Sequence, residues 1–516
     1  MSDSTMTEDA VSPNLDSLVR QVLTSRVYEV SKETPLDPAN KLSRRLRNNI
    51  KLKREDLQPI FSFKIRGAYN KIAQLSPQDQ KKGIITASAG NHAQGVAFAA
   101  ERLGLRAIIV MPQTTAAIKI EAVRAMGAEV VLEGDSFADA MRRCEDLARK
   151  TGLIFVHPFD DPLVVAGQGT IGDEILRQSR GQLDAVFVPI GGGGLIAGIA
   201  GFIKTLNPAV RMIGVEPFEA DAMYRSLEAG RRIQLDHVGI FADGVAVREV
   251  GEYTMPIAQA TVDEVVRVTN DEICAALKDI FDDTRTIMEP AGALAIAGLK
   301  SYVAKEKIRD KHLVALLSGA NMNFDRLRFV AERAELGEAR ETVLGVTIPE
   351  RPGAFREFCS AIGRRVITEF NYRLSQRDQA HIFVGIGTSS KDDAAKLSSS
   401  LNELGYKTVD LSESEVAKLH VRHMVGGHAV DTEHELLCRF EFPERPGALM
   451  HFLDALGDRW NISLFHYRNH GADFGRVLAG FEIPERDRDQ FTEFLEQLGY
   501  PYQLELESSA YDLFLS

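Results

Sequence analysis

Between residues 59 and 329, short apolar runs alternate with longer segments in which apolar residues recur at helical spacing. Short runs of this kind favour buried strands, and the segments 91–103 and 115–126 between them favour helices. The strand-like runs are residues 83–86, 106–111, 129–132, 185–188 and 211–215. Apolar strands that alternate with helices predict a mostly parallel sheet covered on both faces. Ligands of such sheets bind where the carboxyl ends of the strands lead into loops.

The pattern beyond residue 341 occurs twice. Segments 348–355, 367–373 and 401–406 return in the same order as 442–449, 462–468 and 495–500. Each copy is predicted to run strand, helix, strand, strand, helix, strand, which is the ferredoxin-like plan. In the first copy these elements are residues 342–348, 352–364, 366–374, 380–388, 392–404 and 406–411. The sequence of either copy offers no nucleophile beside a base and no metal-ligand spacing, so both copies are expected to bind or pair rather than catalyse.

The segment 331–341 is charged and has few large apolar residues, which predicts a surface helix or linker. We therefore expect a first domain over residues 1–330, a linker over 331–341, and repeat units over 342–418 and 436–514. The length of 516 residues agrees with several domains, because single hydrophobic cores stop growing near about 300 residues.

Composition and charge narrow the possible partners. Hydrophobic residues make up 44% and charged residues 26% of the chain, the balance of an ordinary globular protein. A formal net charge of -12 argues against binding to nucleic acid or to anionic membrane surfaces. The uncharged stretch 185–203 contains Pro189 and four consecutive glycines, which favours a strand, a loop and a helix over a membrane span. Small-molecule chemistry is therefore favoured.

Cysteine spacing and the N-terminal segment indicate the compartment. Cys144, Cys274, Cys359 and Cys438 are far apart and form no C-x-x-C pair, so neither a disulfide framework nor a metal site is predicted. The segment 1–20 is acidic and polar, where an export signal would be basic and then apolar. A cytoplasmic protein is expected.

Lys64 lies between apolar neighbours in the stretch FSFKIRGA, residues 61–68. On its own it could begin an amphipathic helix and extend its amine to water, as most lysines do. The other motifs of the sequence are needed to tell whether Lys64 has this structural role or a chemical one.

A run of four glycines, Gly191 to Gly194, links a predicted strand to a predicted helix. The amides of such a loop and the helix N-terminus favour an anion, which is typical of a phosphate site. One alternative is a dinucleotide-binding loop formed by Gly192, Gly194 and Ala197, with Glu216 as the ribose-binding acid. Another is a tight turn that serves packing alone.

Three further loops follow predicted strands or precede helices. Residues 86–95 are small and polar, which suits the capture of a carboxylate, although Ser88 or Asn91 could equally cap a helix. Residues 317–323 contain Ser318 as a neutral hydrogen-bonding group. Glu289 precedes a helix that starts with a proline, where an acid is also a favourable helix charge.

The motifs SFKIRGA, SAGNHAQG, GGGGL and SGANMNF, in this order over residues 62–324, resemble those of pyridoxal-phosphate enzymes with the tryptophan-synthase-β fold, fold type II. With the repeat, nearly the whole chain resembles the long biosynthetic threonine ammonia-lyases. The resemblance implies an α/β fold type II catalytic domain with mostly parallel sheets in two subdomains. C-terminal to this domain, the resemblance implies tandem α+β ferredoxin-like units of the ACT-like regulatory kind.

The resemblance also assigns roles by position. Lys64 would hold the aldehyde of pyridoxal 5'-phosphate as a Schiff base, and burial among apolar neighbours would lower the pKa of its amine. The other cofactor contacts would be Asn91 at the ring hydroxyl, Ser318 at the ring nitrogen, and Gly191, Gly192, Gly193, Gly194 and Leu195 at the phosphate. The substrate carboxylate would bind the loop of Ser88, Ala89, Gly90, Asn91 and His92. A serine does not demand a protonated ring nitrogen, and the milder electron withdrawal suits elimination.

The implied reaction converts L-threonine to 2-oxobutanoate and ammonia, and L-serine to pyruvate, with Lys64 removing the Cα proton. Serine racemases share the fold and a similar lysine motif. The racemases that resemble this chain carry a serine where it has Ala89, and an alanine cannot carry a proton. A non-catalytic amino-acid sensor is the third possibility, against which the intact Lys64, Asn91 and Ser318 argue.

The repeat units resemble modules that bind branched-chain amino acids. The resemblance implies inhibition by isoleucine, with valine as a candidate opposing effector, and a homotetramer. Candidate effector contacts on the repeated strands are Phe370, Tyr372, Phe465 and Tyr467, although such aromatics also suit a core or an interface. Alternatively, the units serve assembly alone.

Overall fold

The computed structural model describes residues 13–337, 340–349, 357–358, 361–363, 365, 367–374, 379–423, 435–443, 451–452, 455–456, 459–468, 474–505 and 513. The chain divides into two compact units, Met1–Asn323 and Phe324–Ser516. Within the described ranges, every helix is too short or too polar to span a lipid bilayer.

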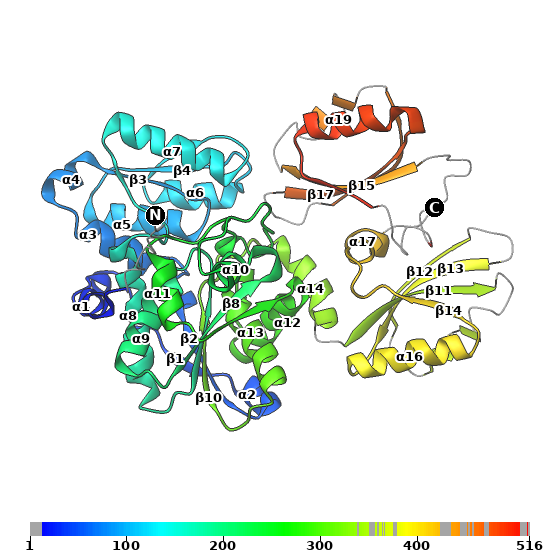
Figure 1. Ribbon diagram of the computed structural model, residues 1–516, viewed down its shortest axis with the longest axis horizontal. Coiled ribbons are helices and arrows are strands. Elements are labelled where there is room, and N and C mark those ends of the chain that lie inside the picture. The colour runs from blue at the N-terminus through cyan, green and yellow to red at the C-terminus, as the bar shows by residue number, and fades with distance from the viewer. Residues whose placement is uncertain are drawn as a thin grey trace, which may run out of the picture. The chain divides into compact units, whose positions relative to one another are not determined.

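Two sheets form the first unit (Figure 1). The larger sheet has the strand order β1-β2-β10-β7-β8-β9, and the smaller has the order β5-β4-β3-β6. All neighbours are parallel except β1 and β2. The strands are β1 Leu36–Pro38, β2 Asn49–Arg54, β3 Ile84–Ala87, β4 Ala107–Met111, β5 Glu129–Leu132, β6 Ile154–Phe155, β7 Ala185–Pro189, β8 Arg211–Pro217, β9 Glu264–Val268 and β10 His312–Leu317. The predicted parallel sheets in two subdomains are confirmed.

Helices cover both faces of the larger sheet, with α8, α9 and α11 on one side and α12 and α13 on the other (Figure 1). The helices of this unit are α1 Leu15–Leu23, α2 Asn40–Leu46, α3 Lys64–Ala73, α4 Pro77–Lys82, α5 Asn91–Leu103, α6 Ala117–Ala125, α7 Phe137–Thr151, α8 Pro162–Ser179, α9 Gly194–Leu206, α10 Ala222–Ala229, α11 Thr254–Thr261, α12 Asn270–Thr284 and α13 Pro290–Glu306. The predicted helix 91–103 is α5. Helix α6 begins later than predicted because Thr115 bonds back to Pro112 in a turn.

Burial explains why the strand-like runs were visible in the sequence. Every residue of β3, β4 and β7 is buried, so these strands are apolar throughout rather than alternating. In the small subdomain, Ile72 of α3 and Val96 of α5 pack with Ile109 of β4 in one apolar cluster. Helices α3 and α5 thereby hold their first residues, Lys64 and Asn91, on the same subdomain.

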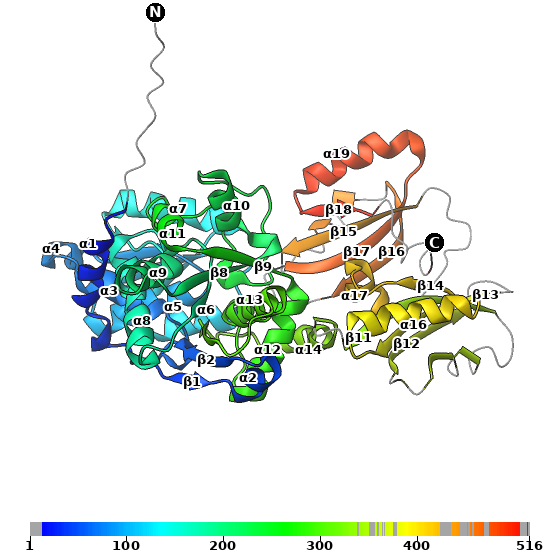
Figure 2. The ribbon, with the colours of Figure 1, turned by 60° about the horizontal axis from the view of Figure 1, so that its bottom comes forward.

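The second unit contains two antiparallel sheets with matching strand orders, β12-β13-β11-β14 and β16-β17-β15-β18. Their strands are β11 Glu341–Pro349, β12 Ile367–Leu374, β13 Gln379–Gly387, β14 Lys407–Asp410, β15 Glu435–Pro443, β16 Asn461–Arg468, β17 Phe474–Glu482 and β18 Tyr502–Leu504. Figure 2 shows α16 Lys391–Glu403 and α19 Arg488–Leu498 each along one face of its sheet. The pairing register shifts at equivalent points of both copies, between Ile367 and Glu369 and between Ile462 and Leu464. The ferredoxin-like repeat is therefore confirmed.

The two sheets share an apolar cluster that includes Val343 and Phe383 from the first copy and Leu437 and Leu478 from the second. Most of the helix predicted over 352–364, together with Cys359, lies outside the described residues, as do the side chains of the four candidate effector aromatics. The thiols of Cys144, Cys274 and Cys438 are buried.

The segment before β11 is largely a helix, α14 Arg326–Gly337. Its Arg333 side chain is 5% exposed and pairs with Glu415 of α17, Glu415–Leu419, at 2.6 Å. The sequence places the end of the first domain at residue 330, whereas the contacts place the division between residues 323 and 324. The difference arises because a partly buried ion pair fixes this charged helix to the repeat units, a contact that composition alone does not show.

Candidate active site

Lys64 is the first residue of α3, and it is partly buried. Its Nζ donates a hydrogen bond to the Pro158 carbonyl at 2.7 Å and lies 5.4 Å from the centre of the Phe63 ring. Burial lowers the pKa of the amine to about 8, and the nearby Glu289 carboxylate opposes the shift. Near neutral pH a useful fraction of the amine is uncharged, as a nucleophile or a base requires.

The lysine loop and the Ser318 loop are joined through their backbones. Ser62 and Gly319 form an antiparallel bridge, the Phe63 amide donates to the Ser318 carbonyl at 3.2 Å, and the Ala320 amide donates to the Phe61 carbonyl at 2.9 Å. Ser318 directly follows β10 and is 3% exposed. Its Oγ donates a long bond of 3.4 Å to the Ala291 carbonyl. The fold thus brings Lys64 and Ser318 together.

Asn91 connects three loops through its side chain. Its Nδ2 donates to Glu289 Oε1 at 2.6 Å, and its Oδ1 accepts from Asn321 Nδ2 at 2.7 Å. Glu289 is 6% exposed and immediately precedes α13. A Cβ at Gly319 would lie 2.6 Å from Glu289 Oε1, so a side chain there would displace the Glu289 carboxylate. Glu289 therefore belongs to this cluster, and Asn321 is a member that sequence reasoning missed.

The four glycines form a closely packed cradle at the start of α9. A Cβ at Gly192 would lie 2.3 Å from the Phe159 ring, and one at Gly194 would lie 2.7 Å from the Phe159 carbonyl oxygen. Gly193 has φ +96°, which side chains rarely adopt. Because α9 begins at Gly194, the amides of its first turn have no acceptor within the helix. This cradle fits a phosphate group. A phosphate site also explains why the loop has four glycines, which is more than a tight turn needs.

Glu216 does not support a dinucleotide site. Its side chain is fully buried at the end of β8, and its two oxygens accept from the amides of Met223 and Tyr224 at 2.9 and 2.8 Å. Burial raises the pKa of this carboxyl to about 8. Glu216 caps the N-terminus of α10 and is not available to a ribose.

The predicted carboxylate loop follows β3. The Ser88 amide donates to the Val110 carbonyl at 3.1 Å, and Ser88 Oγ accepts from the Gly90 amide at 3.3 Å. The His92 ring is 3% exposed, and its Nε2 bonds to the Val156 carbonyl at 3.0 Å. Burial lowers the pKa of His92 to about 3, so the ring is neutral. Ala89 and Gly90 are half-buried beside these groups.

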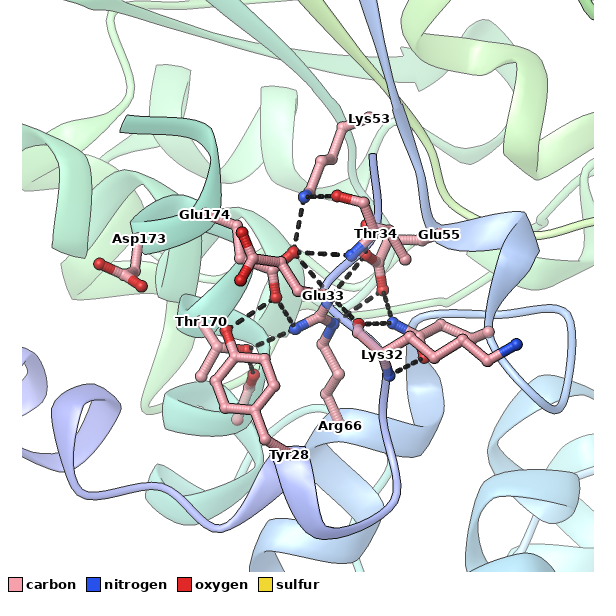
Figure 3. Close-up of polar contacts among 12 residues, drawn as sticks. Tyr28, Lys32, Glu33, Thr34, Lys53, Glu55, Arg66, Thr170, Asp173 and Glu174 are labelled. Carbon is pink, nitrogen blue, oxygen red and sulfur yellow. Dashed lines mark hydrogen bonds and ion pairs between the residues drawn. The ribbon is translucent and has the colours of Figure 1, made fainter. Parts of the chain in front are cut away.

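A fully buried ion cluster holds Arg66 of α3, two residues after Lys64 in the chain (Figure 3). Arg66 pairs with Glu55 at 2.7 Å and with Glu174 of α8 at 2.5 Å, and Lys53 of β2 pairs with Glu174 at 2.5 Å. All four side chains are 0% exposed. Tyr28 adds a bond from its hydroxyl to Glu174 at 2.8 Å. Two cations balance two carboxylates, which is what the burial of four charges requires.

Comparison with known proteins defines the family. The model for pyridoxal-phosphate dependent enzymes matches residues 28–319, and the model for the C-terminal regulatory domain of threonine dehydratase matches residues 332–421 and 426–515. The chain is 54% identical over 501 residues to the biosynthetic L-threonine dehydratase IlvA of Burkholderia multivorans, which covers 96% of this chain and 99% of that protein. The chain belongs to the threonine dehydratases.

Two solved structures place this threonine dehydratase among its structural neighbours. The processed form of threonine deaminase isoform 2 from Solanum lycopersicum is 52% identical, with a TM-score of 0.61 over 62% of this chain and 88% of that chain. A serine racemase from Dictyostelium discoideum is 31% identical, with a TM-score of 0.56 over 61% of this chain and all of its own. The predicted family, fold type and lyase class are confirmed, and so are pyridoxal phosphate as the cofactor and two regulatory units.

Proposed function

We propose that this enzyme converts L-threonine to 2-oxobutanoate and ammonia, and L-serine to pyruvate by the same route. The observation that supports the proposal is the Lys64 amine. Its pKa is lowered, it donates to the Pro158 carbonyl, and its loop is bound to the Ser318 loop through the backbone. The substrate loses its β-hydroxyl as water, and the enamine that results takes up water and releases ammonia. The sequence of steps requires no oxidant or reductant.

The residues of the site divide the tasks of this reaction among them. Gly191 to Gly194 and Leu195 hold the cofactor phosphate, Asn91 the ring hydroxyl, and Ser318 the ring nitrogen. Pyridoxal phosphate, when bound, supplies the electron withdrawal that stabilises negative charge at Cα. Lys64 takes the Cα proton. The loop of residues 88–92 binds the substrate carboxylate through the amides of Ala89, Asn91 and His92, because the amides of Ser88 and Gly90 already donate to the Val110 carbonyl and to Ser88 Oγ.

Ala89 favours elimination over racemisation. A racemase needs a second proton carrier on the face of the substrate opposite the lysine. Ala89 offers a methyl group in the loop proposed to bind the substrate. The likeness to a serine racemase therefore supports a shared fold and cofactor, and Ala89 supports the lyase reaction.

The repeat units are proposed to bind isoleucine as a feedback inhibitor, with valine as the opposing effector, in a cytoplasmic homotetramer. The match of both copies to threonine dehydratase regulatory domains supports a regulatory role. The two copies share an apolar cluster through Val343 and Leu437, so a change in one copy has a direct route to the other. Inhibition then requires different affinities of isoleucine for two states of the enzyme.

The purified protein is expected to release 2-oxobutanoate from L-threonine, and L-isoleucine is expected to suppress the release. Keto-acid formation measured with and without isoleucine tests both halves of the proposal. Release that isoleucine does not change would support the lyase activity and reject isoleucine as an effector. An absence of release from threonine, with D-serine formed from L-serine, would establish the racemase instead.

A chain that ends at Asn323 is expected to keep threonine dehydration and to lose its response to isoleucine. We choose this end because Arg333 of α14 is bound to Glu415 of the repeat units, so a cut near residue 338 would leave α14 without its partner. Isoleucine titrations of the full and shortened chains make the comparison. Inhibition that persists in the shortened chain would place the effector site in the first unit.

A further inference from the structure

The segment 156–161 lies between the lysine and the glycine cradle and contacts both. The Pro158 carbonyl accepts the hydrogen bond from Lys64 Nζ at 2.7 Å. Phe159, the next residue, packs so closely on Gly192 and Gly194 that neither can carry a side chain. His157 Nδ1 accepts from the amides of residues 159 and 160, at 3.2 and 2.7 Å, which fixes the turn between these contacts.

Asp160 connects the same segment to α11. Its carboxylate accepts from three consecutive amides, those of Glu252 at 2.9 Å, Tyr253 at 2.9 Å and Thr254 at 3.3 Å. A Cβ at Gly251 would lie 2.1 Å from Asp160 Oδ1, so the approach requires glycine at that position. The carboxylate thus fixes residues 251–254 at the start of α11.

The segment held by Asp160 in turn holds the carbonyl of Gly192. Thr254 Oγ1 donates to this oxygen at 2.7 Å, and the Gly251 amide donates at 3.0 Å. The Gly192 carbonyl and the Gly193 N–H belong to one trans peptide and point in opposite directions. Two donors on the carbonyl therefore fix the N–H of Gly193 away from α11, in the orientation that a bound anion can use.

We propose that Asp160 is a positioning residue for the phosphate cradle. Through the donors of Gly251 and Thr254, it sets the orientation of the Gly192–Gly193 peptide, and it touches neither the substrate nor the lysine. The proposal rests on the proposed phosphate-binding role of the cradle. Its signature is a loss of affinity for the phosphate group of the cofactor, with the reaction of the aldehyde at Lys64 retained.

The chain offers a matched control in the next residue. Asp161 also caps a helix, because its Oδ1 accepts from the amides of Leu163 at 2.9 Å and Val164 at 3.2 Å. It also pairs with Lys71 at 2.7 Å. These bonds lead to α8 and α3 and not to the cradle. Asp160→Asn and Asp161→Asn therefore remove the same charge from the same loop and differ in what the carboxylate holds.

The experiment titrates full-length apoenzyme with pyridoxal 5'-phosphate and, separately, with pyridoxal, which lacks the phosphate, and follows the absorbance of the bound cofactor. In the wild type, pyridoxal phosphate is expected to bind far more tightly. Asp160→Asn is expected to reduce this preference by about tenfold or more, since a hydrogen bond to a charged group is lost. Asp161→Asn is expected to leave the preference unchanged even if it lowers the melting temperature.

Two variants of Thr254 test the same path if Asp160→Asn fails to fold. Thr254→Val removes the hydroxyl that donates to Gly192 and should reduce the preference, whereas Thr254→Ser keeps the hydroxyl and should restore it. A wild-type preference in Asp160→Asn or in Thr254→Val would overturn the positioning role. An equal affinity of the wild type for both ligands would instead reject the phosphate cradle itself.

Discussion

Replacement of Lys64 by alanine is expected to reduce threonine dehydration by about 10³-fold or more, because one residue supplies both the covalent hold on the cofactor and the base. The amine is suited to both tasks: burial lowers its pKa to about 8, and the Pro158 carbonyl orients it. Steady-state turnover of L-threonine, measured with saturating pyridoxal phosphate, gives the loss directly.

Two variants separate the role of the amine from that of a positive charge. Lys64→Arg keeps the charge but cannot be deprotonated, so it is expected to be as inactive as alanine. Lys71→Ala, on the same helix, removes an ion pair with Asp161 at 2.7 Å and is expected to keep most of the turnover. Near-normal activity in Lys64→Ala would overturn the assignment of the base.

The features predicted from sequence are those that local patterns encode. The buried strands β3, β4 and β7 are apolar at every position, and the glycine run marks a cradle in which a side chain at Gly192 or Gly194 would meet Phe159. Lys64 was found because its motif is contiguous. Each of these signals lies within a few residues of the chain, which is why the order of the residues alone was enough.

The contacts that join the motifs were not predicted, because their partners are far apart in the chain and some are backbone atoms. Lys64 bonds to the carbonyl of a residue 94 positions away, and any residue can supply a carbonyl. Glu216 shows that a matching spacing can also predict a role that the residue does not have. It satisfies the spacing of a ribose-binding acid, yet its carboxylate caps α10. Spacing fixes the distance along the chain and not the direction in which a side chain points.

Neutralising Glu174 is expected to destabilise the first unit by about 3 to 5 kcal/mol, the cost of leaving a buried charge without its partner. In Glu174→Gln, the fully buried Arg66 and Lys53 share the single remaining carboxylate of Glu55 (Figure 3). Denaturant unfolding followed by the absorbance of the bound cofactor measures the change. Turnover should fall as well, because Arg66 holds the helix that begins at Lys64.

The neighbouring residue on α8 provides the control. Asp173 pairs with Arg177 at 2.9 Å on the surface, so Asp173→Asn should cost under about 1 kcal/mol. A loss of the same small size in Glu174→Gln would show that the cluster is not needed for stability.

The deficit of Glu174→Gln should also depend on pH, and the sign follows from Lys53. Burial already lowers the pKa of this amine in the folded enzyme, and the charge of Glu174 opposes the shift. Without that charge the folded pKa of Lys53 falls further, so the pH range in which the unfolded chain binds more protons than the folded one extends to lower pH. The variant should therefore lose more stability at pH 6 than at pH 9.

Adding Lys53→Met to Glu174→Gln removes the excess cation, because Arg66 and Glu55 then remain as a balanced pair. The double variant should recover part of the lost stability, and its stability should depend less on pH.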